Sequence, residues 1–205
     1  MPSETSALTA AALAIVIPIK AFHHAKERLS DLLTPAERFV LAKMCAERVL
    51  RAASEHEVFV VCDDQDVAHW ARDLDAKIVW QPDVGLNAAV RAGVDAARVN
   101  KFDLAIVAHS DLPLATNFSH LFRDCDLQTL KTSVTLVPDR HEDGTNVMIL
   151  PTASDFEFAY GKNSFLVHQE MAKKCGLTVR IIRDQRLAVD IDTADDLAHA
   201  QKLEN

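Results

Sequence analysis

The sequence predicts a Rossmann-like α/β domain, in which a mostly parallel central sheet is covered by helices on both faces. Short apolar runs rich in β-branched residues alternate along the chain with longer segments whose apolar residues recur at helical spacing. Such alternation is typical of a parallel sheet that is buried on both sides. The chain has 205 residues, of which 49% are hydrophobic and 25% charged, so it can bury the core of one ordinary domain.

The first half of the chain alternates regularly between strands and helices. Expected strands cover 14–19, 58–62, 77–80 and 104–108, and expected helices cover 35–53, 64–74 and 86–99. Thr34 and Pro35 suit the N-cap and the first position of the first of these helices. Each strand is followed by a polar segment.

The second half of the chain departs from this rhythm. The expected elements are a helix over 117–125, strands over 133–137 and 147–150, a helix over 164–175, a strand over 177–182 and a last helix to about 203. Gly176 suits the end of the helix before it, and Thr193 suits the cap of the last helix. No repeat, linker or change of composition divides the chain. We therefore predict a single domain over 13–205, preceded by a flexible tail over 1–12.

Charge and composition exclude several classes of protein. The formal net charge is −8, whereas a nucleic-acid polymer needs a basic face, so we expect no such partner. The four cysteines are widely spaced with no C-x-x-C pair, which favours reduced thiols. The apolar stretch 8–19 is too short to span a membrane and lacks the basic start of a signal peptide. We expect a cytoplasmic protein with no membrane partner.

Three cations follow the first strand. In open parallel sheets, ligands bind beyond the carboxyl ends of the strands, and Lys20, Lys26 and Arg28 follow such an end. These side chains are suited to hold the phosphates of a nucleotide, although a solvated helix start would show the same residues. The chain has no glycine-rich phosphate loop, which disfavours a P-loop kinase and an NAD dehydrogenase.

A glycine and an amide open the helix that follows the third strand. Gly85 permits close approach of a nucleotide to the helix start, and Asn87 can hydrogen-bond a base or ribose. A plain loop before a helix is the alternative. On its own this pattern is weak.

Three aspartates follow strand ends and suit a Mg²⁺ site. Asp111 comes directly after the strand 104–108, and a carboxylate there suits Mg²⁺, which is usually held by one or two carboxylates and substrate phosphates. Asp190 and Asp192 alternate at a later strand end, and we expect only one of them to point inward with Asp111. We favour Asp192 as the second ligand and keep Asp190 in reserve. The alternatives are that Asp111 only forms a turn and Asp192 only caps the last helix.

Polar and glycine residues in the second half predict a pocket for an acceptor molecule. Arg140 can pair with a carboxylate or phosphate, Gly161 permits close backbone approach, and neutral donors complete the set. These donors are Thr145, Asn146 and Ser164. Two tight turns with capping side chains are the alternative interpretation.

Six short motifs occur together in a fixed order. They are Ile17-Pro18-Ile19-Lys20 with Ala25-Lys26-x-Arg28-Leu29, Gly85-Leu86-Asn87, Asp111-Leu112-Pro113-Leu114, Pro138-Asp139-Arg140 with Gly144-Thr145-Asn146, Tyr160-Gly161-x2-Ser164-Phe165, and Val189-Asp190-Ile191-Asp192-Thr193. In this order they resemble the 2-phospho-L-lactate guanylyltransferase family over about 14–198. Each motif is weak alone, but six in order are specific.

The resemblance implies a nucleotidyltransferase (GT-A-like) fold and a reaction that needs Mg²⁺. GTP would donate GMP to a phosphorylated three-carbon acid and release pyrophosphate, in the biosynthesis of coenzyme F(420). The acid would be 2-phospho-L-lactate, phosphoenolpyruvate or 3-phospho-D-glycerate. By the family pattern Thr145, Gly161 and Ser164 meet the acid, and Lys20, Lys26, Arg28 and Asp111 take part in catalysis. One position departs from the pattern, because His109 stands where similar enzymes often carry a second acid.

Two other functions fit parts of the sequence. A relative of the molybdopterin guanylyltransferases would need a G-x-[ST]-x-R loop after the first strand, and this chain lacks one. A non-catalytic GTP-binding sensor is disfavoured by the presence of Lys26, Asp111 and Asp192. A homodimer is compatible with the sequence, which does not decide the oligomeric state.

Overall fold

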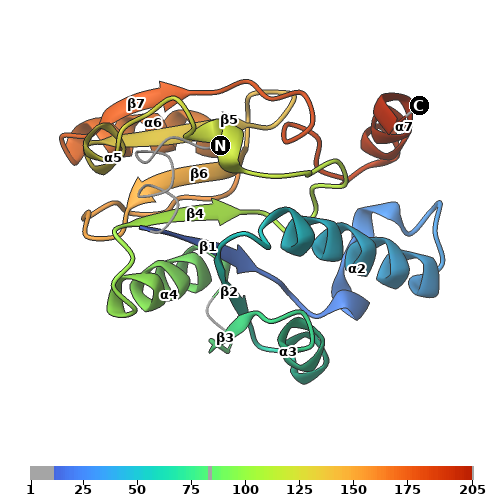
Figure 1. Cartoon of the computed structure of the whole chain (residues 1–205). Helices are drawn as coiled ribbons and strands as arrows, with labels where there is room; N and C mark the ends of the chain where they lie inside the picture. The colour runs from blue at the N-terminus through green and yellow to red at the C-terminus, as the bar shows by residue number, and fades with distance from the viewer. Residues whose placement is uncertain (1–11, 83–84, 205) are drawn as a thin grey trace.

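A seven-stranded sheet forms the centre of the molecule in the computed structural model, which describes residues 12–82 and 85–204 (Figure 1). The strands are β1 (Leu13–Pro18), β2 (Glu57–Cys62), β3 (Lys77–Trp80), β4 (Leu104–Ala108), β5 (Ser133–Pro138), β6 (Thr145–Pro151) and β7 (Thr178–Ile181). Their order across the sheet is β3-β2-β1-β4-β6-β5-β7. Each expected strand is confirmed.

Six strands run parallel, and β6 runs antiparallel to its neighbours β4 and β5. The reason is the short turn between β5 and β6, because a connection of this length can only join antiparallel strands. The predicted mostly parallel sheet is therefore confirmed, with one reversed strand. Because β5 runs in the same direction as β1 and β4, the β5–β6 turn lies at the same edge as the ends of β1 and β4.

Most of the helices begin where the sequence signals predict. They are α2 (Pro35–Ala52), α3 (Gln65–Arg72), α4 (Gly85–Val99), α5 (Leu127–Lys131), α6 (Ser164–Lys174) and α7 (Ala194–Glu204), with 3₁₀ turns at Phe22–His24, Glu27–Leu29 and Ser119–Leu121. At the start of α2, the Thr34 hydroxyl accepts from the Glu37 amide, and the Glu37 carboxylate accepts from the Thr34 amide. Thr193 and Asp196 exchange the same pair of bonds before α7. No helix within 12–82 and 85–204 is long and apolar enough to cross a bilayer.

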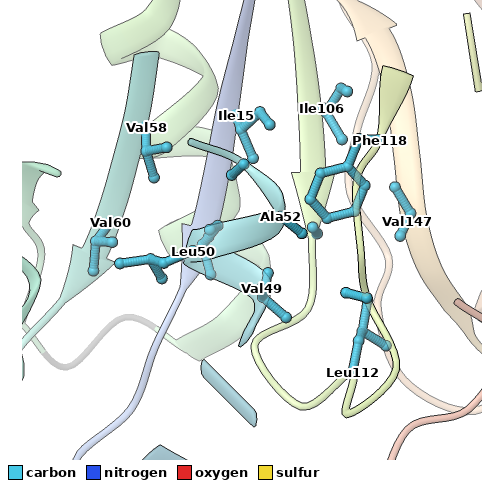
Figure 2. Packing of buried hydrophobic residues seen from close by; sticks show 14 of the residues in the cluster. Ile15, Val49, Leu50, Ala52, Val58, Val60, Ile106, Leu112, Phe118 and Val147 are labelled. Carbon is cyan, nitrogen blue, oxygen red and sulfur yellow. The ribbon is translucent and has the colours of Figure 1, made fainter. Parts of the chain in front are cut away.

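Helices cover both faces of the sheet, so β1 buries side chains on each side. Ile15 packs on one face with Val49 and Leu50 of α2 (Figure 2). Val16 packs on the other face with residues of α4. Gly93 permits this close approach, because a Cβ there would lie 2.3 Å from Cγ1 of Val16.

One predicted helix is wrong. Within 117–125 only Ser119–Leu121 is helical, as a single 3₁₀ turn, and the short helix α5 follows at Leu127–Lys131. Phe118, Leu121 and Phe122 are spaced as on a helix, but all three are buried in the core, where tertiary packing decides the local conformation. Residues 1–11 of the predicted tail lie outside the described part of the chain.

Candidate active site

A cavity of about 870 Å³ opens at the carboxyl ends of β1 and β4. Its walls come from the segments after these strands, the β5–β6 turn, the connection from β6 to α6 and the segment before α7. Residues far apart in the sequence therefore meet at one edge of the sheet, as expected for an open parallel sheet.

Most of the predicted site residues line this cavity. They are Lys20, Lys26, Arg28, Asp111, Thr145, Asn146, Gly161, Ser164, Asp190 and Asp192. Gly85 lies in a smaller adjoining pocket of about 70 Å³, which shares Lys20 and Leu86 with the main cavity. Gly85 has a φ of +71°, the left-handed conformation that favours glycine.

Two predicted residues are not in the position expected of them. Asn87 is exposed. Its side-chain oxygen Oδ1 accepts a 2.7 Å hydrogen bond from the backbone amide of Tyr160, and this bond connects α4 to the segment before α6. Arg140 does not line the cavity, which corrects its assignment to an acceptor pocket. Its guanidinium binds the carboxylates of Asp195 and Asp196 at the start of α7.

Three carboxylates gather on the cavity wall. One oxygen from each of Asp111, Asp190 and Asp192 lies within 4.8 Å of the others. The expectation that only one of Asp190 and Asp192 points inward is wrong, because residues two apart in an extended segment project to the same side. Burial raises the pKa of Asp190 to about 6, and the nearby Asp111 carboxylate adds to this effect.

Lys26 balances this negative charge. Its ammonium lies 2.7 Å from Oδ2 of Asp111 and 3.2 Å from Oδ1 of Asp192, and its side chain is only 6% exposed. Burial opposes the charged form, but the two carboxylates outweigh it and raise the pKa of Lys26. In return, Lys26 overcomes burial and lowers the pKa of Asp111. Lys26 also has a φ of +59°, and such left-handed non-glycine residues cluster at functional sites.

Several donors on the acceptor side are already engaged. The Thr145 hydroxyl lies 3.0 Å from Nδ1 of the buried His168. The Asn146 amide donates to the Leu187 carbonyl and to Oδ1 of Asp190. Asn146 therefore orients an acid of the carboxylate cluster, a role that its place in the sequence did not indicate.

The turn before Thr145 is built around Asp139, which also lines the cavity. Its carboxylate accepts from the amides of His141, Asp143 and Gly144. A Cβ on Gly144 would lie 2.7 Å from Oδ2 of Asp139, so glycine is needed for the close approach of chain and carboxylate. This contact fixes the path by which the chain enters β6.

Three buried polar atoms on the cavity wall have no hydrogen-bond partner within the described residues. These are Oδ1 of Asp111, Nε2 of His109 and the hydroxyl of Tyr160. The rings of His109 and Tyr160 lie 5.0 Å apart between centroids. Burial lowers the pKa of His109 and raises that of Tyr160, so both groups stay neutral near pH 7. Tyr160 belongs to one of the six motifs, but the motif indicates no role for its side chain.

The carboxylate cluster fits a magnesium ion. Mg²⁺ prefers oxygen ligands, and Asp111, Asp190 and Asp192 offer three. The unpartnered Oδ1 of Asp111 is a buried acceptor that a cation would satisfy.

The sheet order brings the acidic cluster and the cations to one strand edge. The fold is similar to that of a protein from Desulfovibrio desulfuricans G20 assigned to the nucleotide-diphospho-sugar transferases, with a TM-score of 0.71, 15% identity and coverage of 91% of this chain and 85% of the other. The Rossmann-like nucleotidyltransferase (GT-A-like) fold is therefore confirmed.

The chain belongs to the family described as Guanylyl transferase CofC like, whose model matches residues 13–201. It is 36% identical over 187 residues to the phosphoenolpyruvate guanylyltransferase of Sphaerobacter thermophilus, covering 89% of each chain. It is 34% identical over 188 residues to the 2-phospho-L-lactate guanylyltransferase of Methanothermobacter thermautotrophicus, covering 89% of this chain and 81% of the other. The protein is thus a guanylyltransferase, and the family inferred from its six motifs is confirmed.

Proposed function

We propose that the protein transfers GMP from GTP to a phosphorylated three-carbon acid and releases pyrophosphate, as a step in the biosynthesis of coenzyme F(420). The acceptor is 2-phospho-L-lactate, phosphoenolpyruvate or 3-phospho-D-glycerate. The first two of these acids occur in the names of its relatives. We expect the reaction to take place in the cytoplasm.

The observation that carries this proposal is the cluster of Asp111, Asp190 and Asp192, with Lys26 paired to two of its carboxylates. A phosphate oxygen of the acceptor attacks the α-phosphorus of GTP, and two polyanions must approach each other for this to happen. Positioning and charge neutralisation therefore provide most of the catalysis in phosphoryl and nucleotidyl transfer. A cavity that holds both cations and metal-binding carboxylates meets this need.

Mg²⁺ would be held by Asp111, Asp192 and Asp190 and, when bound, would neutralise charge on the reacting phosphates. Lys20 and Arg28 line the cavity on the side of β1 and would bind the triphosphate. Lys26 adds a third positive charge next to the carboxylates. Gly85 has nothing within 4 Å of its Cβ position, so it would let the nucleoside approach the start of α4 closely.

The acceptor acid would bind on the opposite side, where β6 and α6 begin. Thr145, Gly161 and Ser164 line the cavity there. Gly161 has a φ of +134° and a Cβ at this residue would meet nothing within 4 Å, so its role is to let the chain turn and expose its backbone. The nucleotide and the acid thus enter from two sides of the carboxylate cluster.

A substrate panel tests the proposal. Purified protein is incubated with Mg²⁺, one nucleoside triphosphate and one of the three acids, and the product is identified by mass. We expect a guanylylated acid and an equal amount of pyrophosphate with GTP and one or more acids, and no pyrophosphate when the acid is omitted. If none of the three acids releases pyrophosphate from GTP, the proposed reaction is wrong.

A further inference from the structure

Two polar groups on the cavity wall have no part in the function proposed above. Nε2 of His109 and the hydroxyl of Tyr160 are both buried and have no partner in the described part of the chain. Buried polar atoms in native proteins nearly always have a hydrogen-bond partner, either protein or water. Two unpartnered atoms on cavity-lining residues whose rings lie side by side are therefore candidates for contact with a bound ligand.

Both groups lie on the side assigned to the acceptor. His109 follows β4, and its amide donates to the carbonyl of Asn146 in β6 at 3.0 Å. Tyr160 directly precedes Gly161 in the connection to α6. The two side chains thus form part of the wall between the carboxylate cluster and the start of α6.

The chemistry of the pair selects one kind of ligand group. The phenol O–H is a hydrogen-bond donor, and Nε2 of the imidazole is a donor in the tautomer that carries its proton there. Donors in a water-poor site stabilise an anion. The reacting phosphate of the acceptor must lie by the cations and the carboxylate cluster, where its charge is balanced. The second anionic group of a phosphorylated acid is its carboxylate, which remains for the wall formed by His109 and Tyr160.

We propose that His109 and Tyr160 bind the carboxylate of the acceptor and thereby select phosphorylated acids over phosphorylated alcohols. The inference rests on the proposed function and adds to it the residues that recognise the acid group. It also explains why a histidine stands two positions before Asp111, because a carboxylate side chain there would repel the acid.

The Tyr160 side chain is held in place before any ligand binds. Its ring stacks on Phe158 at 6.2 Å between centroids and meets the edge of His168 at 4.8 Å. Its backbone amide donates to Asn87 at 2.7 Å. A hydroxyl fixed in this way loses little conformational entropy when it binds the substrate, which strengthens its contribution to selectivity.

The test compares the acid that the enzyme uses with an analogue in which a methyl group replaces the carboxylate. The analogue is isopropyl phosphate for 2-phospho-L-lactate, isopropenyl phosphate for phosphoenolpyruvate, and 2-hydroxypropyl phosphate for 3-phospho-D-glycerate. We expect the wild-type enzyme to prefer the acid by about 100-fold or more in kcat/KM, because the analogue leaves buried donors unpaired. Similar use of acid and analogue would overturn the proposal without any variant.

Tyr160→Phe removes only the hydroxyl. We expect kcat/KM for the acid to fall about 10- to 100-fold through a higher KM for the acid, with the KM for GTP and the kcat/KM for the analogue within about threefold of wild type. His109→Leu should act in the same direction, and His109→Gln, which keeps an N–H, should restore part of the preference. The matched control is Thr152→Val, which removes a buried hydroxyl that donates to the Phe102 carbonyl outside the cavity.

The outcomes separate this proposal from the one on which it rests. If the wild-type enzyme turns over no acid, both fail. If it turns over an acid but Tyr160→Phe lowers the rates with acid and analogue equally, the guanylyltransferase function stands and the carboxylate assignment is wrong. If Tyr160→Phe raises the KM for GTP instead, the pair binds the nucleotide and the assignment is again wrong.

Discussion

The ammonium of Lys26 lies 2.7 Å from Oδ2 of Asp111, although the two residues are 85 positions apart in the sequence. The contact joins the segment after β1 to the segment after β4, which are neighbouring strands in the sheet. It concentrates a cation and a carboxylate at the point where the fold exposes its parallel strand ends. Both partners stay charged near pH 7, because each stabilises the ionised form of the other.

Asp111→Asn should abolish most turnover while the fold is retained. The amide keeps the size of the side chain but removes the charge that holds Lys26 and, in the proposed mechanism, Mg²⁺. We expect kcat to fall about 100-fold or more, as for the loss of other charge-stabilising groups. Steady-state rates and thermal unfolding check the two parts, with Asp195→Asn, at an exposed carboxylate paired with Arg140, as the control. Activity near that of wild type would show that the metal assignment is wrong.

Most of the fold and much of the candidate site could be predicted from the pattern of strands in the sequence. Short apolar runs can be recognised without tertiary information, and parallel strands bring their carboxyl ends to one edge by geometry alone. For this reason Lys20, Lys26, Arg28 and Asp111 could be placed together before the structure was known. The family could be predicted only from the order of the six motifs, because each motif alone is too common to identify it.

Tertiary contacts decided what the sequence could not. The segment 117–125 has helical spacing, but its aromatic residues fill the core from an irregular chain. Arg140 follows a strand end like the other site residues, but its side chain pairs with Asp195 and Asp196 at the start of α7 and does not line the cavity. Such pairings depend on where two distant segments meet, and neither segment shows this by itself.

The affinity for Mg²⁺ should depend on pH through Asp190. Burial, together with the Asp111 carboxylate, raises the pKa of Asp190 to about 6. Asp190 is therefore ionised above this pH and protonated below it, and a protonated carboxyl is a poor ligand. We expect Mg²⁺ affinity, measured by calorimetric titration, to be constant above about pH 7 and to fall by up to about tenfold per pH unit below 6. The Asp190→Asn variant should bind Mg²⁺ more weakly, and its affinity should change less with pH. If its affinity depends on pH as that of wild type does, Asp190 is not the group that titrates.

Gly144→Ala should disturb acid binding through the β5–β6 turn. The new Cβ would lie 2.7 Å from Oδ2 of Asp139, so either the turn before Thr145 or the carboxylate that holds it must shift. We expect a higher KM for the acid, little change in the KM for GTP, and a loss of about 1 to 3 kcal/mol in the free energy of unfolding. Steady-state kinetics with each substrate varied and denaturant titrations measure these effects.

Gly176→Ala is the matched control for that substitution. Gly176 follows α6 with a φ of +71° and has nothing within 4 Å of the Cβ position. Alanine there should cost about 1 kcal/mol of stability through backbone strain and leave both KM values unchanged. If Gly144→Ala behaves like Gly176→Ala, the turn does not position the acid site.

The free energy of unfolding should fall as the pH drops from about 6.5 to about 4, because His168 is buried in its neutral form. Burial, aided by the charge of His109, lowers the pKa of His168 to about 4, whereas an exposed histidine titrates near 6.5. Between these values the unfolded chain binds a proton that the folded chain does not, so stability rises with pH in this window and is fully present above it. The pKa shift of His168 corresponds to a loss of roughly 3 kcal/mol at most in the free energy of unfolding.

Replacing His168 should reveal this contribution. Its Nε2 accepts from the Ala159 amide at 3.1 Å and its Nδ1 lies 3.0 Å from the Thr145 hydroxyl, so His168→Gln loses part of a buried network and should be less stable at pH 7.5. Because glutamine does not titrate, its unfolding free energy should fall less steeply than that of wild type between pH 6.5 and 4.5. Denaturant titrations at several pH values measure both slopes. Equal slopes would mean that His168 already binds its proton in the folded protein, and that the acid lability comes from other groups.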